Sequence, residues 1–521
     1  MLTVIFLSIS PIHAAIQLPA VISDHAVFQA DKPVVIWGWA DPGAKIKVAF
    51  INEDGTAASE FSATADAKGK WFGKLPALKS GRTGKLKVTT DKGEEKTVSD
   101  ILVGEVWLGG GQSNMTYDIG GTKGGFPEEA AEIANNVAIA QREANAAKPP
   151  IRYFSVAKNS PAQPVDDVKG NWVLGDSKNV SNFSAVAWNF AVALQNKLHT
   201  PIGLIASCVG GTPAEAWMSK ETIEATSVGA AVFARHTKNL AGLTPEKIRK
   251  HIAALNAWHT ANPTGELQRK NKSSKPSLYL PTDNLAPTLL YNGMIHGLEP
   301  YTMRGIIWFQ SDGNWKAPLE YAELFQALIK SWRAQWGDEL PFYFVELNNM
   351  YEEQTKPVDL SSHPILREQQ HAGLLLPKVG MASSIDLGSK NAHFPNKKPV
   401  GERLAGMALC DCYGVSMGQV NSPMFTSFSI EGNNIRLRFT DAGGLHIRSG
   451  NELKGFAIRG SSGDWNWANG KIDGQEIVVW CEQVLSPIAV RYAWAKNPVI
   501  SVVNGAGLPL CPFRTDIDSK D

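Results

Sequence analysis

The chain has 521 residues, which is too long for a single hydrophobic core and implies several domains. Lys and Arg together number 51 and Asp and Glu number 50, so the formal net charge is +1 at pH 7. This balance, without a long basic run, argues against nucleic acid or an anionic membrane as the main partner.

The first segment, residues 2–15, is apolar and ends in the small residues Ala14 and Ala15. It resembles the hydrophobic region and cleavage site of a secretory signal, although the basic residues that usually precede such a region are missing. No later stretch approaches the length of a transmembrane helix. We therefore expect a signal peptide at residues 1–15 and a secreted or periplasmic protein without a transmembrane segment.

Two regions read as β-structure. Short alternating runs at residues 34–39 and 45–50, separated by turn signals such as Asp41-Pro42-Gly43, predict an N-terminal β-sandwich domain over residues 16–99. Its expected role is that of a scaffold. The same pattern of short alternating runs and turn signals recurs near the C-terminus, for example at residues 434–439. It predicts a C-terminal β domain over residues 416–521.

Between these regions, residues 100–415 alternate apolar strands with amphipathic helices. Six strands are expected, at residues 101–108, 151–156, 202–207, 305–309, 342–347 and 379–385, with helices over residues 184–198 and 321–336. This alternation is typical of a parallel sheet covered by helices on both faces, in which ligands bind at the carboxyl ends of the strands. Residues 222–285 interrupt the pattern. They are polar and lack a strand signal, so we expect a helical excursion with a loose loop.

The first of these strands runs into a glycine-rich segment, GEVWLGGGQSNM at residues 104–115. Three glycines are followed by Gln112, Ser113 and Asn114. An α/β enzyme can present a nucleophile in this way, because glycine permits a sharp turn and a following helix directs N–H groups at developing negative charge. Taken alone, the same residues also fit an ordinary glycine-rich loop with a solvated serine.

Three more polar segments follow predicted strands. They contain the glycine pair Gly210 and Gly211, the amides Gln310 and Asn314, and His393. A serine, a glycine N–H, an amide side chain and a histidine are the groups that acyl transfer to water requires. Each also has a structural interpretation, as turn glycines, an Asx turn or one of eleven histidines. The catalytic hypothesis depends on all four lying at strand ends of one sheet.

The five cysteines, Cys208, Cys410, Cys412, Cys481 and Cys511, are odd in number and unevenly spaced. They do not form a recognisable disulfide framework, and their spacing does not suit zinc. Cys410 and Cys412 are too close in sequence for an easy bridge. A single bridge among the others stays open.

Several segments, in the right order along the chain, carry a resemblance to one family: residues 18–42, 104–115, 210–217 (GGTPAEAW), 291–298 (YNGMIHGL) and 396–405 (NKKPVGERLA), followed by GFAIRG, VRYAWAKNP and PFRTD. The chain resembles the sialate O-acetylesterase family within the SGNH (GDSL-like) hydrolases, nearly end to end. The resemblance implies an SGNH-hydrolase-like three-layer α/β/α core with β-sandwich-like flanking domains. It also implies hydrolysis of O-acetyl esters on carbohydrates without a metal or cofactor.

Carried over by position, the resemblance makes Ser113 the nucleophile and His393 the general base. The backbone N–H groups of Ser113 and Gly210 and the side chain of Gln310 would form the oxyanion hole. Asn314 would help to shape the same loop.

Two blocks depart from the family pattern. The family usually reads Trp-Tyr-Gln-Gly-Glu-Ser-Asn, whereas residues 308–314 read WFQSDGN. It also usually has Asp-Ile-His-Pro around its histidine, whereas residues 391–394 read NAHF, and Lys390 replaces the aspartate that SGNH enzymes commonly have three residues before the histidine. The third triad member therefore stays open between Asp386 and a backbone carbonyl, and the second choice leaves a Ser–His dyad.

The expected function is serine-dependent hydrolysis of O-acetyl groups, from sialic acid or from an acetylated polysaccharide such as xylan or xyloglucan. The alternative is a catalytically impaired carbohydrate-binding protein on an esterase scaffold, supported by the two altered blocks, the β domains and the 16 tryptophans. A free sialic acid would call for a basic anchor near Ser113. The absence of an arginine next to any site segment in the sequence slightly favours a neutral sugar.

Overall fold

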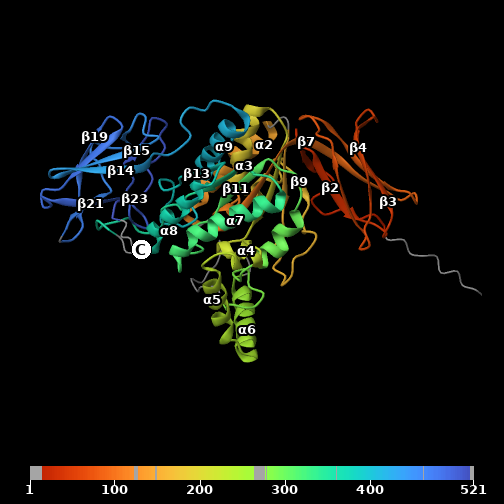
Figure 1. Cartoon of the computed structure of the whole chain (residues 1–521), viewed down its shortest axis with the longest axis horizontal. Coiled ribbons are helices and arrows are strands. Elements are labelled where there is room, and N and C mark those ends of the chain that lie inside the picture. The colour runs from red at the N-terminus through yellow and green to blue at the C-terminus, as the bar shows by residue number, and fades with distance from the viewer. Residues whose placement is uncertain are drawn as a thin grey trace, which may run out of the picture.

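The computed structural model describes residues 15–122, 127–146, 150–262, 276, 278–358, 361–461 and 463–516. Figure 1 shows three parts along the long axis: N-terminal strands, a helix-covered sheet in the middle, and C-terminal strands at the other end. Two helices project from the middle part. The predicted signal segment lies outside the described residues, apart from Ala15.

A mixed sheet forms the centre of the middle part, with the strand order β13-β12-β11-β7-β10-β8-β9. The bounds of these strands are Val379–Ala382, Phe342–Val345, Gly305–Phe309, Glu95–Gly111, Ile202–Cys208, Ile151–Ser155 and Trp172–Leu174. The strands from β13 to β8 are parallel to their neighbours, whereas β9 pairs with β8 in the antiparallel sense. All six predicted strands are present. The prediction of a parallel sheet is corrected at its edge, because β9 returns beside β8 without a crossover helix.

The long strand β7 connects the N-terminal strands to this sheet. Its first part pairs with β6 (Thr83–Thr90) and β1 (Val27–Gln29), and its last part lies between β10 and β11. Every residue from Ile101 to Gly111 is buried, which accounts for the continuous apolar run in the sequence. The strand thus passes through the domain boundary predicted at residue 99 without a linker.

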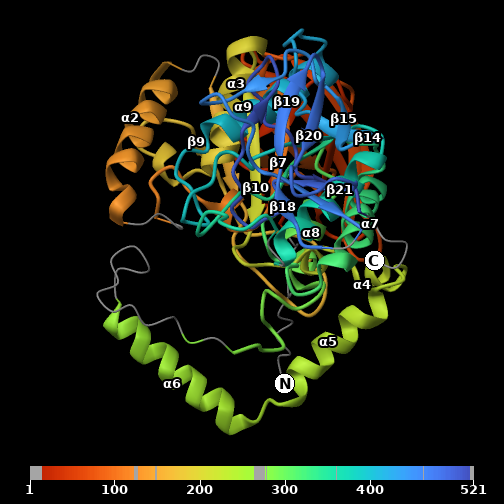
Figure 2. The same cartoon turned by 90° about the vertical axis from the view of Figure 1, so that its left-hand side faces the viewer.

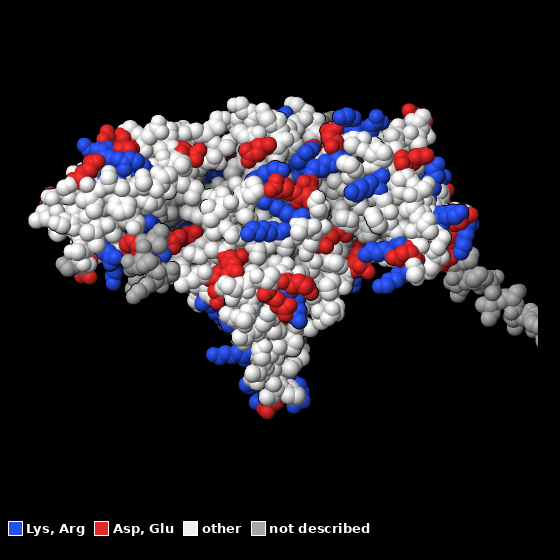
Figure 3. Space-filling view, viewed as in Figure 1, with Lys and Arg blue, Asp and Glu red and all other residues white. Residues whose placement is uncertain are grey.

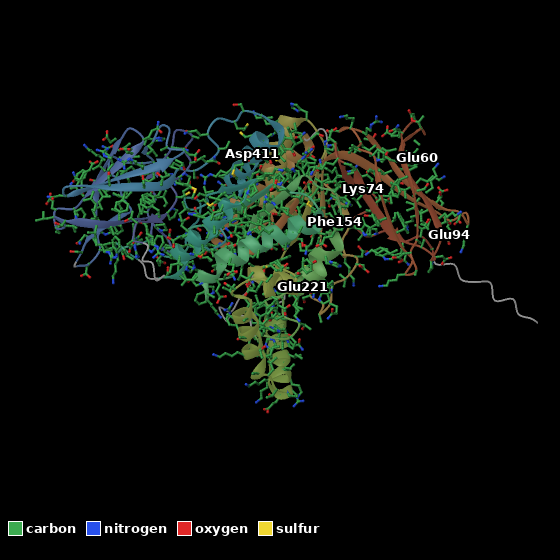
Figure 4. The ribbon with its side chains drawn as sticks, viewed as in Figure 1. Glu60, Lys74, Glu94, Phe154, Glu221 and Asp411 are labelled. Carbon is green, nitrogen blue, oxygen red and sulfur yellow. The ribbon has the colours of Figure 1, made fainter. Side chains whose placement is uncertain are left out.

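Helices cover both faces of the central sheet. They are α2 (Ala130–Ala146), α3 (Ala185–Leu198), α7 (Tyr321–Trp336), α8 (Ser362–Gln370) and α9 (Lys398–Tyr413). Successive side chains of a strand point to opposite faces, so in β11 Trp308 packs in the same core as α7, whereas Ile307 packs in the core that contains α3 and α9. Asp411 of α9, labelled in Figure 4, accepts a hydrogen bond from the Tyr343 hydroxyl of β12 (3.0 Å). The two predicted helices, α3 and α7, are confirmed.

Up to residue 261 the described part of the 222–285 excursion is largely helical, whereas residues 278–285 form turns. It contains the end of α4 (Lys220–Glu224), α5 (Gly229–Ala241) and α6 (Pro245–Ala261). Figure 1 shows α5 and α6 extending away from the sheet, and Figure 2 shows them meeting at their far ends and diverging toward the body. Among its residues α6 buries only Trp258. The lysine-rich stretch at residues 270–275 lies outside the described residues.

Antiparallel strands occupy both regions for which β domains are predicted. On the N-terminal side β3 (Lys45–Asn52) pairs with β4 (Ala57–Thr64) and β6, and β2 (Val34–Trp39) pairs with β5 (Lys70–Leu75). The C-terminal strands form the orders β14-β15-β20-β19 and β18-β17-β21-β23. Their bounds are Met424–Glu431, Asn434–Thr440, Glu476–Trp480, Asn469–Asp473, Asn466–Trp467, Phe456–Gly460, Pro487–Tyr492 and Phe513–Arg514. The division into sandwich domains at residues 16–99 and 416–521 stays a prediction.

The surface carries both signs of charge. Figure 3 shows Lys and Arg side chains interspersed with Asp and Glu over the face in view. Within the described ranges, which contain all five cysteines, none of them forms a disulfide. Over the described ranges, no helix combines the length and the apolar character needed to cross a membrane.

Candidate active site

Three loops leave the central sheet side by side. Gly111 at the end of β7 is in register with Cys208 at the end of β10 and with Phe309 at the end of β11. Because these strands are parallel, the residues that follow them emerge at the same edge. The register therefore brings together the serine, glycine and amide segments that the sequence places at strand ends.

A glycine makes the turn from β7 toward Ser113. Gly111 has a φ of 129°, and a Cβ there would lie 2.2 Å from the carbonyl oxygen of Phe309, so only glycine fits. After Gln112 the chain enters the short helix α1 (Ser113–Thr116), in which Ser113 is the first residue and is half-buried. The backbone N–H of Ser113 belongs to the first turn, whose N–H groups have no acceptor within the helix.

Gly210 lies directly against Ser113. A Cβ on this glycine would be 3.5 Å from the Cβ of Ser113 and 4.0 Å from its backbone nitrogen. Any longer side chain would fill the space beside the serine. The contact fits a shared oxyanion hole, although the role of the Gly210 N–H in it stays a prediction.

The side chains of Gln310 and Asn314 join the loops after β10 and β11. Nε2 of the buried Gln310 donates to Oδ1 of Asn314 (2.7 Å) and to the carbonyl of Thr212 (3.4 Å). Asn314 Oδ1 also accepts from the Ala214 N–H (2.9 Å), and its Nδ2 donates to Glu215 (2.8 Å). Asn314 thus has the loop-shaping contacts expected of it. The oxyanion role predicted for Gln310 requires its longer bond, to Thr212, to open.

The altered block at residues 311–313 packs closely against its neighbours. The Gly313 N–H donates to Oε1 of Gln112 (3.1 Å), which ties the block to the residue before Ser113. A Cβ on Gly313 would lie 2.3 Å from the carbonyl oxygen of Thr212. The glycine in this block is therefore required by the spacing between the two loops.

Replacing Gly313 with alanine is expected to lower kcat/KM about 100-fold, because the two loops must move apart and misplace the groups around Ser113. The measurement is steady-state hydrolysis of a small acetyl ester, with thermal unfolding to verify folding. Gly242→Ala is the matched control, since the nearest atom to its added Cβ would be 3.7 Å away. Wild-type kinetics in a folded Gly313→Ala variant would refute the importance of this spacing.

The loop that carries His393 follows β13 and is hydrogen-bonded to Asn114, which lies just after the end of β7. Nδ2 of this buried residue donates to Ser311 Oγ (2.8 Å), to Asn348 Oδ1 (3.2 Å) and to the carbonyl of Ala392 (3.1 Å). The residue after Ser113 is therefore bonded to the residue before His393. Among the described contacts no hydrogen bond joins the Ser113 and His393 side chains themselves, so their pairing stays a prediction.

The surroundings of His393 favour its neutral form. Burial, and secondarily the charge of Lys397, lower the pKa of His393 from 6.5 to about 4. A neutral imidazole is the form that accepts a proton. Its half-buried ring is thus in the protonation state that a general base needs at neutral pH.

The carboxylate of Asp386, one of the two possible partners of His393, is engaged elsewhere. Its oxygens accept from Arg403 at 2.7 and 2.9 Å, and it is buried. Asn391, at the position of the family's aspartate, accepts from the backbone N–H of His393 (2.9 Å) instead of from its ring. These contacts favour a Ser–His dyad over a triad through Asp386.

Two residues close to the site are not predictable from the sequence. Lys397 is 1% exposed, and its ammonium nitrogen donates to Asn114 Oδ1 and lies 3.3 Å from the ring centroid of Phe394. Burial holds the pKa of Lys397 well below its usual range. His363 is also buried, with Nε2 4.0 Å from Oδ2 of Asp312. Lys397 lies in the segment at residues 396–405 that resembles the family, but two consecutive lysines in a sequence do not predict that one of them is buried.

The chain matches known proteins along most of its length. It is 26% identical to the sialate O-acetylesterase of Rattus norvegicus over 92% of this chain and 89% of the relative. It is 27% identical to the human sialate O-acetylesterase over 70% of this chain and 64% of the relative. A carbohydrate acetylesterase from Xanthomonas citri superposes with a TM-score of 0.76 and 33% identity, covering 97% of this chain and 100% of that chain. No family model matches.

Proposed function

The chain belongs to the family of carbohydrate acetylesterases that includes the Xanthomonas citri enzyme, and on this premise we propose that it removes O-acetyl groups from sugars with Ser113 as nucleophile. It is a carboxylic ester hydrolase. The observation that carries the proposal is the contact between Gly210 and Ser113 where β7, β10 and β11 end in register.

The proposed reaction has two acyl-transfer steps. His393 takes the Ser113 hydroxyl proton as Oγ attacks the acetyl carbonyl carbon, and the N–H groups of Ser113 and Gly210 stabilise the resulting oxyanion. The intermediate expels the sugar oxygen, which takes the proton from His393 and leaves as an alcohol. Water then attacks the acetyl group on Ser113 with the same histidine as base, and acetate is released.

A neutral sugar suits the surroundings better than a sialic acid. Arg235 of α5 lines a hollow together with residues of the loops after β10 and β11, although the sequence has no arginine beside them. Both terminal nitrogens of this guanidinium bind Glu320, each at 2.6 Å, so its charge is already paired. A sialate carboxylate would have to displace Glu320. We therefore favour an acetylated polysaccharide over a free sialic acid as the substrate. The apolar segment at residues 2–15 supports export of the protein to where such polymers occur.

Acetate release from a panel tests the proposal: O-acetylated sialic acid and acetylated xylan, xyloglucan and glucomannan. We expect release from at least one polysaccharide, and its loss after treatment with a fluorophosphonate that labels the Ser113 peptide in a mass spectrum. No release from any member of the panel, with sugar binding retained, would favour the impaired carbohydrate-binding protein.

A further inference from the structure

A hollow of about 250 Å³ opens beside the candidate active site. Gly211 and Asn314 form its inner side, next to the residues that surround Ser113. Its outer side is formed by two parts of the excursion, α5 and the later segment that includes Tyr279. We propose that this hollow is a subsite for a neutral sugar ring of the substrate chain, with the indole of Trp315 as its stacking surface. The inference rests on the proposed deacetylation and adds to it where the polymer binds.

Trp315 is exposed, although two other residues of its loop are buried. Its exposed fraction is 48%, whereas Ser311 and Asn314 are 3% and 5% exposed. The backbone N–H of Trp315 donates to the carbonyl of Asp312 (2.9 Å), which fixes the backbone of this turn. The backbone of Trp315 is therefore fixed while its indole lies partly in water, and a sugar face stacked on the indole would remove apolar surface from water.

One face of α5 is directed at the same hollow. Val232, Arg235, His236 and Asn239 all line it, and their spacing of i, i+3, i+4 and i+7 places them on a single side of the helix. The rest of α5 is largely exposed, with buried residues only at Gly229 and Val232. The excursion therefore contributes a wall to the site as well as a projection from the fold.

The polar groups of this wall suit an uncharged ligand. Arg235 is paired with Glu320, and Nδ1 of His236 is 2.6 Å from the Tyr279 hydroxyl. Asn239 is exposed and offers an amide donor and acceptor to sugar hydroxyls. Lys316 lies over Trp315, with its ammonium nitrogen 5.6 Å from the ring centroid, and it is the cation that an anionic sugar would use.

The test compares a polymer with a small ester in the same variants. Trp315→Ala is expected to raise KM for the preferred acetylated polysaccharide about 10-fold and to leave hydrolysis of p-nitrophenyl acetate within about 2-fold of wild type. Asn239→Ala is expected to shift the polymer KM in the same direction by a smaller factor. Trp467→Ala, which removes an indole that is 41% exposed on β18, is the matched control. It should change neither the KM for the polymer nor the hydrolysis of p-nitrophenyl acetate.

Three outcomes would overturn the subsite. The first is an unchanged KM for the polymer in Trp315→Ala. The second is an equal loss of activity on the polymer and on p-nitrophenyl acetate in Trp315→Ala. The third is a higher KM for O-acetylated sialic acid in Lys316→Met, while Trp315→Ala has no effect on any polymer. The second would mean that Trp315 only supports the loop at residues 311–314. Failure of the proposed function is distinguishable, because wild type would then release no acetate from any sugar ester.

Discussion

Ser113→Ala should lower kcat for acetate release by about 10⁴-fold or more, because no acyl-enzyme can form without Oγ. The remaining activity would come from the oxyanion donors acting on direct attack by water. Folding should be unaffected, since Ser113 is half-buried and the substitution removes a single oxygen atom. The measurement is kcat on the preferred acetylated sugar, together with thermal unfolding of both proteins.

A second serine close to this site supplies the control. Ser311 lies in the altered block, and its Oγ accepts from Asn114 (2.8 Å). Ser311→Ala should cost less than about 10-fold, because it weakens one of several bonds that hold Asn114. The assignment of Ser113 would be wrong if the two losses were equal or reversed.

The strands that position the site were predictable because their sequence signals are local. The apolar runs that become β7, β10 and β11 are each followed by glycines or polar residues, and burial from Ile101 to Gly111 explains the first of them. The extension of β7 back to Glu95 was not apparent, because its exposed polar residues there read as part of the preceding β region. The antiparallel β9 is not predictable either, because a three-residue strand gives almost no periodic signal.

The contacts within the site were less predictable because they depend on loops that meet only in the fold. Asp386 and Arg403 are 17 positions apart, and nothing in their spacing shows that they pair. The sequence therefore left Asp386 open as the partner of His393. The separation of Lys397 from Asn114 is 283 positions, and their contact depends on the return of the His393 loop across the sheet. Patterns in a sequence indicate which segments reach one edge of a sheet, but not which polar atoms then meet.

The activity should persist into acidic conditions. With the pKa of His393 lowered to about 4, the acid limb of kcat/KM should have an apparent pKa near that value instead of near 6.5. The free energy of unfolding also depends on this pKa. Between pH 6.5 and 4 the imidazole of His393 binds a proton in the unfolded chain but stays neutral in the folded chain. His393 therefore lowers the free energy of unfolding as the pH drops through that window.

Histidine variants establish which ring is responsible for this limb. His393→Ala should lower kcat by about 10³-fold or more, whereas His363→Ala should leave an acid limb at the same pH. His363 is the relevant comparison because it is also buried and lies near Asp312 of the altered block. A large loss in His363→Ala together with near-normal rates in His393→Ala would move the general base to α8.

Lys397→Met then separates the two causes of the lowered pKa. The methionine keeps the length of the buried side chain but removes the positive charge, which is the smaller cause, so the acid limb should move to higher pH. It should stop short of 6.5 because burial, the larger cause, remains. Loss of the bond to Asn114 Oδ1 should also lower kcat, through the contact that holds Ala392 beside Asn114. If kcat falls but the acid limb of the pH profile does not move, Lys397 acts only by positioning this loop. If the acid limb moves but kcat is unchanged, Lys397 acts only on the pKa of His393.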